Sequence, residues 1–364
     1  MRPLFLLAAL FSTALFAQSS GDAVANAHVV YANRHFEQTG VSAAPDGRLF
    51  VNYPRWSDRY LNAVIVQTPD GSQEPYPDLE WNRWDGKPQT AANHFVCVQA
   101  VLVDQANTLW VVDPAAPLLT SPVPNGPKLV RIDLLTNRVL QVFPMEQVAL
   151  PDSYLNDIRI DNKRNFAYLT DSGHGGIIVL DIGTGESWRK LDGNPSVLGN
   201  PTIPVVVHGF ELKQPNGKPA LFNSDSIELS KDGNTLYYKA INSDTLWSVP
   251  TALLRDRSAD PSPAVKAAAT NLFPTDGLWM DSKNRLYLSD VEHNAVRRLN
   301  TTGQLELIFE SPALDWSDTF SEDASGNIYI SASRLDEQPR YHDGYSTRHG
   351  RPYLIFRLDG LDPH

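Results

Sequence analysis

The stretch that decides the fold of this chain reads Thr275-Asp276-Gly277-Leu278-Trp279-Met280-Asp281-Ser282-Lys283-Asn284-Arg285-Leu286-Tyr287-Leu288-Ser289-Asp290. An acidic residue comes first, and a short apolar segment, a polar turn and a second apolar segment with an aromatic residue follow. Polar turn residues between two apolar segments are typical of a β-hairpin. The stretch therefore predicts two antiparallel strands, with Asp276 directly before the first one.

A phrase of this kind occurs six times along the chain. Its copies begin at Thr39, Gln99, Asn156, Asp225, Asp276 and Asp318. An aromatic residue follows 11 positions later in copies one, two, five and six and 12 positions later in copies three and four, at Phe50, Trp110, Tyr168, Tyr237, Tyr287 and Tyr329. This regular register indicates a structural repeat.

The repeat favours an all-β fold, a six-bladed β-propeller with four antiparallel strands in each blade. Short strands need a neighbour on both sides to bury their faces, and a closed ring of blades supplies it. We expect residues 28–33 and 353–358 to close the ring by sharing a blade. A β-helix or a sandwich is the alternative, and the uneven repeat spacing argues against the helix. One short peripheral helix is expected at residues 262–269.

The composition excludes some partners. The chain has 364 residues and a net charge of −11, and it contains no run rich in Lys and Arg. Nucleic acids and anionic membranes are therefore poor candidate partners. A monomer that binds a small organic molecule is expected.

The first 17 residues have the features of a secretory signal peptide. One positive charge precedes an apolar run that is too short for a stable membrane span, and small and polar residues follow. We expect cleavage after Ala17, a loose segment at 18–27, a propeller at 28–364, and export to the periplasm or the medium. Cys97 is the only cysteine of the sequence, so an internal disulfide is excluded.

The first residues of the six repeats are the main candidates for a functional site. Inner strands of a propeller run the same way along the channel, so these six polar residues are expected to meet at one end of it. Three of them are carboxylates, and converging carboxylates require either a raised pKa or a bound cation. Their oxygen ligands suit Ca²⁺ better than zinc or copper. Asn156, Asp225 and Asp276 are the expected metal ligands; the alternative is that these residues only cap strands.

Other candidates surround this ring. We expect His94, Gln99 and Asp318 to contact a ligand at the channel mouth. His94 and His208 lie near repeat junctions and are candidate acid/base groups, or ordinary loop histidines. Five aromatic residues of the early loops are candidates for the wall of a ligand pocket or for blade packing, namely Tyr53, Trp56, Tyr60, Trp81 and Trp84.

Several segments resemble the major royal jelly protein/yellow family. These are residues 99–101, 109–113, 155–158, 168–172, 176–181, 187–189, 316–320 and 331–335. The resemblance implies a six-bladed propeller, and insect members of the family are secreted, some of them binding small amines. In the wider group of gluconolactonase-like and paraoxonase-like propellers, Glu, Asn, Asn and Asp hold a catalytic divalent ion. That similarity implies ligand roles for Asn156, Asp225 and Asp276, with Asp276 as base or nucleophile, whereas Thr39 stands where the Glu is expected.

Three function classes follow from these patterns. The leading hypothesis is a propeller that binds a small organic molecule at the channel mouth. The alternative is a metal-dependent hydrolase of a lactone or ester, in which the ion polarises the carbonyl and Asp276 handles the proton. A propeller that binds another protein is the third class.

Overall fold

The computed structural model of the protein describes residues 26–342 and 350–361. The expected signal peptide at 1–17 and most of the loose segment at 18–27 lie outside the described residues. In the described ranges, no helix has the length and apolar character needed to cross a bilayer.

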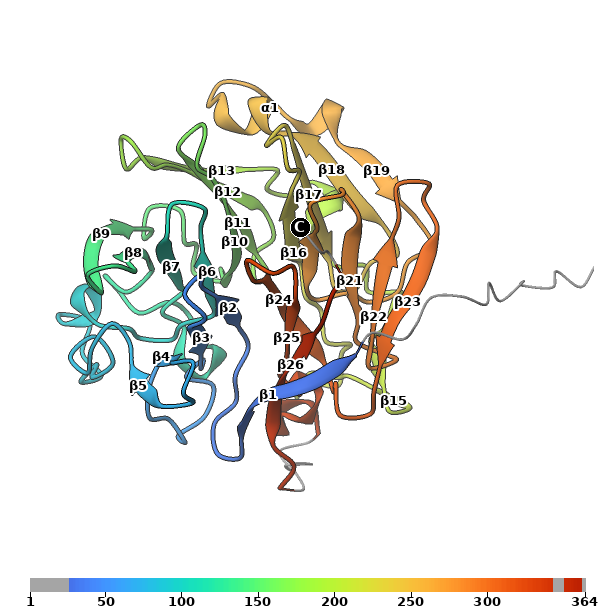
Figure 1. Ribbon diagram of the computed structural model, residues 1–364. Coiled ribbons are helices and arrows are strands. Elements are labelled where there is room, and N and C mark those ends of the chain that lie inside the picture. Colours follow the sequence, from blue (N-terminus) through green and yellow to red (C-terminus); the bar gives the residue numbers. More distant parts are fainter. Residues whose placement is uncertain (1–25, 343–349, 362–364) are drawn as a thin grey trace, which may run out of the picture.

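The described residues form six four-stranded antiparallel sheets, and Figure 1 shows them in sequence order around a common axis. Blade one contains β2 (Val41–Ala43), β3 (Leu49–Asn52), β4 (Val64–Gln67) and β5 (Gln73–Pro75). Blade two contains β6 (Ala100–Val103), β7 (Thr108–Asp113), β8 (Lys128–Asp133) and β9 (Arg138–Pro144). Blade three contains β10 (Leu155–Asp161), β11 (Phe166–Asp171), β12 (Ile177–Asp181) and β13 (Ser187–Lys190).

The second half of the ring is built in the same way. Blade four contains β16 (Ser224–Leu229), β17 (Thr235–Ala240), β18 (Leu246–Pro250) and β19 (Lys266–Ala269). Blade five contains β20 (Leu278–Met280), β21 (Leu286–Asp290), β22 (Ala295–Leu299) and β23 (Leu305–Glu310). Blade six contains β24 (Ser317–Glu322), β25 (Ile328–Ala332), β26 (Tyr353–Leu358) and the N-terminal strand β1 (Ala27–Asn33). The six-bladed propeller is therefore confirmed.

The two ends of the described chain close the ring. Strand β1 pairs antiparallel with β26, with Ala27 opposite Leu358 and Asn33 opposite Tyr353. In Figure 1 the blue strand β1 lies beside the red strand β26 as the outermost strand of blade six. The expected closure by residues 28–33 and 353–358 is confirmed.

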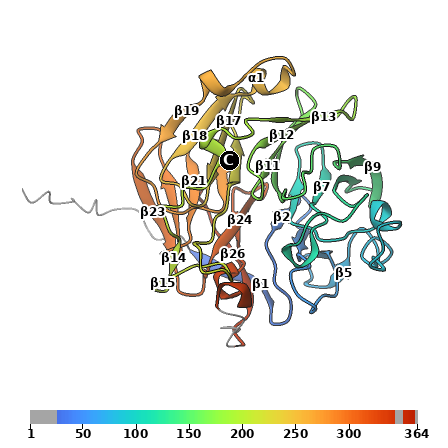
Figure 2. The same cartoon turned by 180° about the vertical axis from the view of Figure 1, so that it is seen from behind.

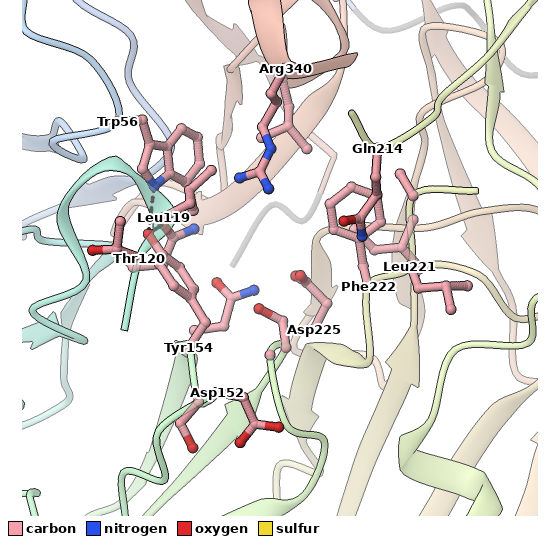
Figure 3. A pocket seen from close by; sticks show the side chains of 18 of the residues that line it. Trp56, Leu119, Thr120, Asp152, Tyr154, Gln214, Leu221, Phe222, Asp225 and Arg340 are labelled. Carbon is pink, nitrogen blue, oxygen red and sulfur yellow. Dashed lines mark hydrogen bonds between the residues drawn. The ribbon is translucent and has the colours of Figure 1, made fainter. Parts of the chain in front are cut away.

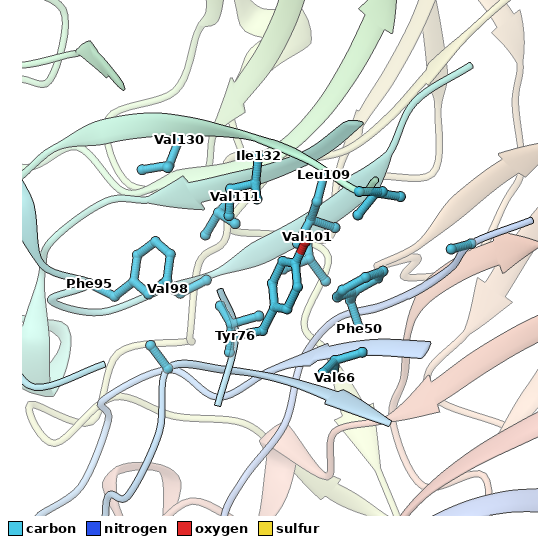
Figure 4. Close-up of a cluster of buried hydrophobic side chains, with 14 residues drawn as sticks. Phe50, Val66, Tyr76, Phe95, Val98, Val101, Leu109, Val111, Val130 and Ile132 are labelled. Atoms are coloured by element: carbon cyan, nitrogen blue, oxygen red, sulfur yellow. The ribbon is translucent and has the colours of Figure 1, made fainter. Parts of the chain in front are cut away.

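Apolar side chains between neighbouring blades hold the ring together. Between blades one and two, Phe50 and Tyr76 pack edge to face with ring centroids 4.7 Å apart. Their neighbours Val101, Leu109 and Val130 come from blade two, and Figure 4 shows the combined cluster. Each fully buried side chain of this size contributes about 1.5–3 kcal/mol through the hydrophobic effect. The repeated aromatic position of the sequence therefore serves to pack blade against blade.

The expected helix at 262–269 is wrong. Residues Ser262–Ala264 form a single 3-10 turn, and residues Lys266–Ala269 form strand β19, which pairs with β18. Because an isolated helix of eight residues is marginal in water, the backbone hydrogen bonds offered by the edge of β18 decide the conformation. The short α-helix α1 lies earlier, at Thr251–Arg255.

The insertion at 194–219 contains a small hairpin of β14 (Val206–Val207) and β15 (Phe210–Glu211). Figure 2 shows it below β23, and hydrogen bonds join it to the segments that follow β21 and precede β24, from Val206 to Glu292 and from His208 to Asp315.

Ion pairs fix the pocket ends of three second strands. Each of these strands ends in a fully buried aspartate that pairs with a basic side chain of the same blade: Asp113 with Lys128 at 2.7 Å, Asp171 with Arg189 at 2.9 Å, and Asp290 with Arg297 at 2.6 Å. Asp113 also accepts hydrogen bonds from the amides of Val96 and Cys97. These aspartates anchor the loops that surround the channel mouth.

Candidate functional site

A cavity of about 720 Å³ lies at the end of the channel where the inner strands begin. Five of the six residues that begin a repeat line it: Gln99, Asn156, Asp225, Asp276 and Asp318. The structure thus brings together all three predicted metal ligands and two of the predicted ligand contacts. A volume of this size is typical of sites for small organic molecules.

Asn156, Asp225, Asp276 and Asp318 form the floor of this pocket, and the three carboxylates among them are buried. Burial raises the pKa of Asp225 well above its usual range, and the charges of Asp276 and Asp318 raise it further. The interaction between the side chains of Asp225 and Asp276 raises the pKa of Asp225 and lowers that of Asp276. The pKa of Asp318 is also raised by burial and then by the charge of Asp276. Three buried carboxylates in one site require either raised pKa values or a bound cation.

Trp316 orients one of these carboxylates. Its indole Nε1 donates a hydrogen bond of 2.6 Å to Oδ2 of Asp276. Burial raises the pKa of Asp276 to about 7, and the bonds from Trp316 and Asp225 oppose that rise. Trp316 has a φ of +53°, a left-handed conformation that is rare for a bulky residue and is often found at functional sites. This role was not predicted from the sequence. The only local indication is the position of Trp316, two residues before Asp318.

Thr39, the first residue of copy one, does not line the cavity. Its hydroxyl donates to the carbonyl oxygen of Gln99 at 2.8 Å and accepts from Nδ2 of Asn52 at 2.8 Å. Thr39 therefore joins blade one to blade two instead of facing the pocket, and it supplies no carboxylate to the floor.

Arg159, in the inner strand β10, connects three neighbouring blades. Its Nε pairs with Oε2 of Glu228 at 3.1 Å, and one of its terminal nitrogens donates to the carbonyl oxygen of Leu278 at 2.7 Å. The guanidinium also lies 3.8 Å from Oδ2 of Asp157, where it opposes the rise in the pKa of that buried carboxyl. One arginine thus links blades three, four and five.

The walls of the pocket are aromatic. Figure 3 shows Trp56 and Tyr154 on one side of the cavity and Phe222 on the other, with the guanidinium of Arg340 and the carboxylate of Asp225 pointing into the space between them. The indole of Trp56 donates to the hydroxyl of Tyr154 at 2.7 Å, and that hydroxyl donates to Oε1 of Gln99 at 2.9 Å. This chain of hydrogen bonds fixes one wall relative to the floor.

Of the five aromatic residues proposed for the wall, the cavity is lined by Trp56 alone. Tyr53 is hydrogen-bonded to Tyr31, Trp81 packs on Phe95, and Tyr60 and Trp84 lie against Arg55.

The histidines are not where the sequence analysis expected them. His94 does not line the cavity: Nδ1 is 2.8 Å from the carbonyl oxygen of Thr90, and Nε2 is 3.3 Å from Glu80. The turn that carries His94 directs its ring to these local partners and not into the cavity at which the ligand contact was expected. His208 is likewise absent from the lining and contacts Asp315.

The donor set at the floor fits a hard cation. Carboxylate and amide oxygens of Asn156, Asp225, Asp276 and Asp318 are the ligands that Ca²⁺ takes in proteins, and they would hold such an ion here. Among the described residues that line this cavity there is no His or Cys, so a soft transition metal has few suitable ligands. A bound divalent ion would neutralise the charge of the floor and polarise an oxygen atom of a molecule above it.

Comparisons with solved structures agree with the fold. A luciferin-regenerating enzyme is 10% identical with a TM-score of 0.57, over 93% of this chain and 96% of that one. Regucalcin, a calcium-binding protein from Agrobacterium tumefaciens, is 14% identical with a TM-score of 0.54, over 92% of this chain and 96% of that one. A gluconolactonase from Xanthomonas campestris is 13% identical with a TM-score of 0.56, over 92% of this chain and 89% of that one. At such identities the likeness concerns the fold alone.

Sequence comparison is more specific. No curated protein matches the chain significantly. The sequence profile of the major royal jelly protein family matches residues 96–311, which is more than half of the chain. The matched range contains Gln99, Asn156, Asp225 and Asp276 and therefore most of the pocket floor. The chain belongs to the major royal jelly protein family.

Proposed function

We propose that this protein binds a small organic molecule in the channel-mouth pocket, above a divalent cation, Ca²⁺, held by the aspartates of the floor. The observation that carries the proposal is the meeting of Asp225, Asp276 and Asp318 at the base of a cavity of about 720 Å³. Burial raises the pKa values of all three, the charges of neighbouring carboxylates add to the rise for Asp225 and Asp318, and a bound cation would offset this cost. Regucalcin, described as a calcium-binding protein, shares the fold and supports the choice of ion.

The side chains of the pocket walls indicate the shape and the charge of the organic molecule that would bind. Trp56, Tyr154 and Phe222 offer aromatic surface on both sides of the space, which favours a flat or apolar body. Arg340 points its guanidinium into the same space and suits a carboxylate, phosphate or carbonyl oxygen. A flat molecule with one anionic or carbonyl group would satisfy the walls, Arg340 and the ion together.

Hydrolysis of a lactone or ester is the second candidate, and one observation favours it. Asp276 lines the cavity and is held in place by Trp316, so its carboxylate is positioned to accept a proton from a molecule in the pocket. A divalent ion at the floor would supply the Lewis acid that polarises the carbonyl. Asp276 would then take the proton of the attacking water. The fold likeness to a gluconolactonase is consistent with this candidate.

A thermal-shift screen tests the binding proposal. Chelator-treated protein is loaded with Ca²⁺ and mixed with aromatic carboxylates, aromatic amines, sugars, lactones and aryl esters. We expect at least one class to raise the melting temperature, and Arg340→Ala to abolish the shift. Exposed Asp152 lines the same cavity, and Asp152→Asn is the control that should keep it. A screen without any shift would contradict ligand binding and favour a protein-binding propeller.

The same proteins separate binding from catalysis. Lactones and aryl esters that bind are followed for product formation. Turnover that requires Ca²⁺ and is lost in Asp276→Asn would establish the hydrolase. Binding without turnover would leave a binding protein.

A further inference from the structure

A second group of metal-ligating side chains lies outside the pocket, where the hairpin of the 194–219 insertion meets blade six. His208 lies in the turn between β14 and β15, Asp315 lies two residues before β24, and Asp336 lies in the 3-10 turn Leu335–Glu337 after β25. One ligand atom from each of the three lies within 4.8 Å of the others. The hydrogen bond between His208 and Asp315 joins the hairpin to the segment that precedes blade six.

The distances between the three groups suit a shared cation. Nε2 of His208 is 2.8 Å from Oδ1 of Asp315 and 4.0 Å from Oδ2 of Asp336. Ligand atoms that each lie about 2.1 Å from one zinc ion are roughly 3.4 Å apart in a tetrahedral site. Shifts of less than an ångström in the three side chains would therefore place them around one ion.

The second line of evidence is a buried carboxylate without sufficient partners. Asp336 is only 4% exposed, and its Oδ1 has no hydrogen-bond partner within the described residues. The same carboxylate faces His208 through Oδ2. A buried carboxylate with an unsatisfied oxygen costs free energy unless something is bound to it.

The neighbouring arginines do not satisfy Asp336. Arg334 and Arg351 both pair with Glu337, and Arg351 also contacts Oδ2 of Asp315 at 3.3 Å. Among the described residues, the ion-pair partner of the Asp336 carboxylate is His208, at 4.0 Å.

We propose that His208, Asp315 and Asp336 form a second cation site that binds a first-row transition dication, Zn²⁺, and fastens the hairpin to blade six. One imidazole nitrogen and two carboxylates form a ligand set typical of zinc, and three protein ligands leave a fourth position for water. His208 is 42% exposed at its side chain, so that position faces solvent. This donor set differs from the all-oxygen floor of the channel pocket.

The site would act on the pocket through its sequence neighbours. Leu335, next to Asp336, lines the cavity, and Trp316, next to Asp315, holds Asp276. Phe222 and Gln214, which follow the hairpin in the chain, line the opposite wall. An ion that joins the hairpin to blade six would hold these pocket segments at fixed positions relative to each other.

The test uses the full chain, freed of metal by chelation and titrated with Zn²⁺ by calorimetry, and with Co²⁺ as a spectroscopic probe of imidazole ligation. The informative variant is His208→Asn, because Asn tolerates the left-handed φ of +51° at this position but is a poor zinc ligand. Asp336→Asn is the second variant, since it keeps the shape of the side chain. His293→Gln is the matched control, because His293 pairs with a buried aspartate whose other oxygen is already held by Arg297.

We expect the wild-type protein and His293→Gln to bind Zn²⁺ and to gain thermal stability from it. His208→Asn and Asp336→Asn should weaken Zn²⁺ binding by at least about 100-fold, because loss of outer partners alone costs 10–100-fold. Asp276→Asn should keep this Zn²⁺ site, which separates it from the Ca²⁺ proposed at the floor. Equal Zn²⁺ binding by the wild type, His208→Asn and Asp336→Asn, or no Zn²⁺ binding by the wild type, would overturn the proposal.

Discussion

Trp316 donates its indole N–H to Oδ2 of Asp276 over 2.6 Å, and both residues are buried. The bond joins the segment before blade six to the first residue of the blade-five repeat. Asp276 also lines the cavity and interacts with the side chain of Asp225. The orientation of the floor therefore depends on a tryptophan that lies outside the repeat.

Trp316→Phe should lower both stability and cation binding. Loss of a hydrogen bond to a charged group costs about 1.5–3 kcal/mol, and the smaller ring adds a cavity term. Chemical denaturation and Ca²⁺ titration measure the two effects. Trp110→Phe is the control, because buried Trp110 donates in the same way to Asp104 in blade two. It should lose similar stability and keep its Ca²⁺ affinity; equal loss of affinity in both variants would argue against a specific role for Trp316.

Arg159→Met should destabilise the ring strongly. The variant leaves the buried carboxylate of Glu228 without its cation, and breaking a buried pair in this way costs about 3–5 kcal/mol. Adding Glu228→Gln should restore part of the loss. The exposed pair of Arg257 and Glu186 gives the comparison, since Arg257→Met should change the free energy of unfolding by less than about 1 kcal/mol. Similar effects of the two arginine substitutions would show that Arg159 does not hold the blades together.

Lys239 gives a pH-dependent prediction. Burial lowers the pKa of its amine to about 7, and its Nζ donates to the carbonyl oxygens of Ala240 and Ile241. Between pH 7 and about 10.5 the unfolded chain binds this proton and the folded chain does not, so stability from this group rises with pH over that window and is lost as pH falls through 7.

Lys239→Met removes this dependence. The free energy of unfolding of Lys239→Met minus that of the wild type should be larger at pH 6 than at pH 9. The expected difference is at least about 1.4 kcal/mol, the equivalent of one pH unit. Denaturant titrations at both pH values measure the difference. Lys266→Met on the edge strand β19 controls for the lost charge, and a constant difference between wild type and Lys239→Met would refute the prediction.

Gly277→Ala tests the close approach of blades five and six. A Cβ at this position would lie 1.8 Å from the carbonyl oxygen of Asp318, so the backbone must move. We expect a loss of about 1–3 kcal/mol and weaker Ca²⁺ binding, because the shift displaces Asp276 and Asp318 from each other. Gly183→Ala, whose nearest neighbour is a side-chain amide at 3.0 Å, should be close to neutral. Full stability and Ca²⁺ affinity in Gly277→Ala would contradict this packing.

The repeat made the fold predictable, together with the floor of the pocket. The polar first residue and the aromatic residue of each copy occupy fixed places in every blade, so the register alone brings Asn156, Asp225, Asp276 and Asp318 to one end of the channel. Thr39 shows the limit of the register, because its side chain turns toward Gln99 and Asn52.

The walls of the pocket were not predictable in the same way. Tyr154, Phe222 and Arg340 come from loops whose paths depend on contacts with distant segments, and no local pattern marks them. His94 shows the same effect, since partners within its own loop hold its ring. Strand β19 differs from the expected helix because pairing with β18 outweighs the helix propensity of a short alanine-rich segment.

The most direct test of the proposed Ca²⁺ site is a calorimetric titration of chelator-treated protein with Ca²⁺, for the wild type, Asp276→Asn and Asp152→Asn. The wild type and Asp152→Asn should each bind one Ca²⁺ per chain, and Asp276→Asn should bind at least about tenfold more weakly, because affinity depends on the number of charged ligands. Removal of one of three repelling carboxylates should also make ion-free Asp276→Asn more stable than the ion-free wild type at pH 8. No Ca²⁺ binding by the wild type, or equal affinity in Asp276→Asn, would contradict the central claim.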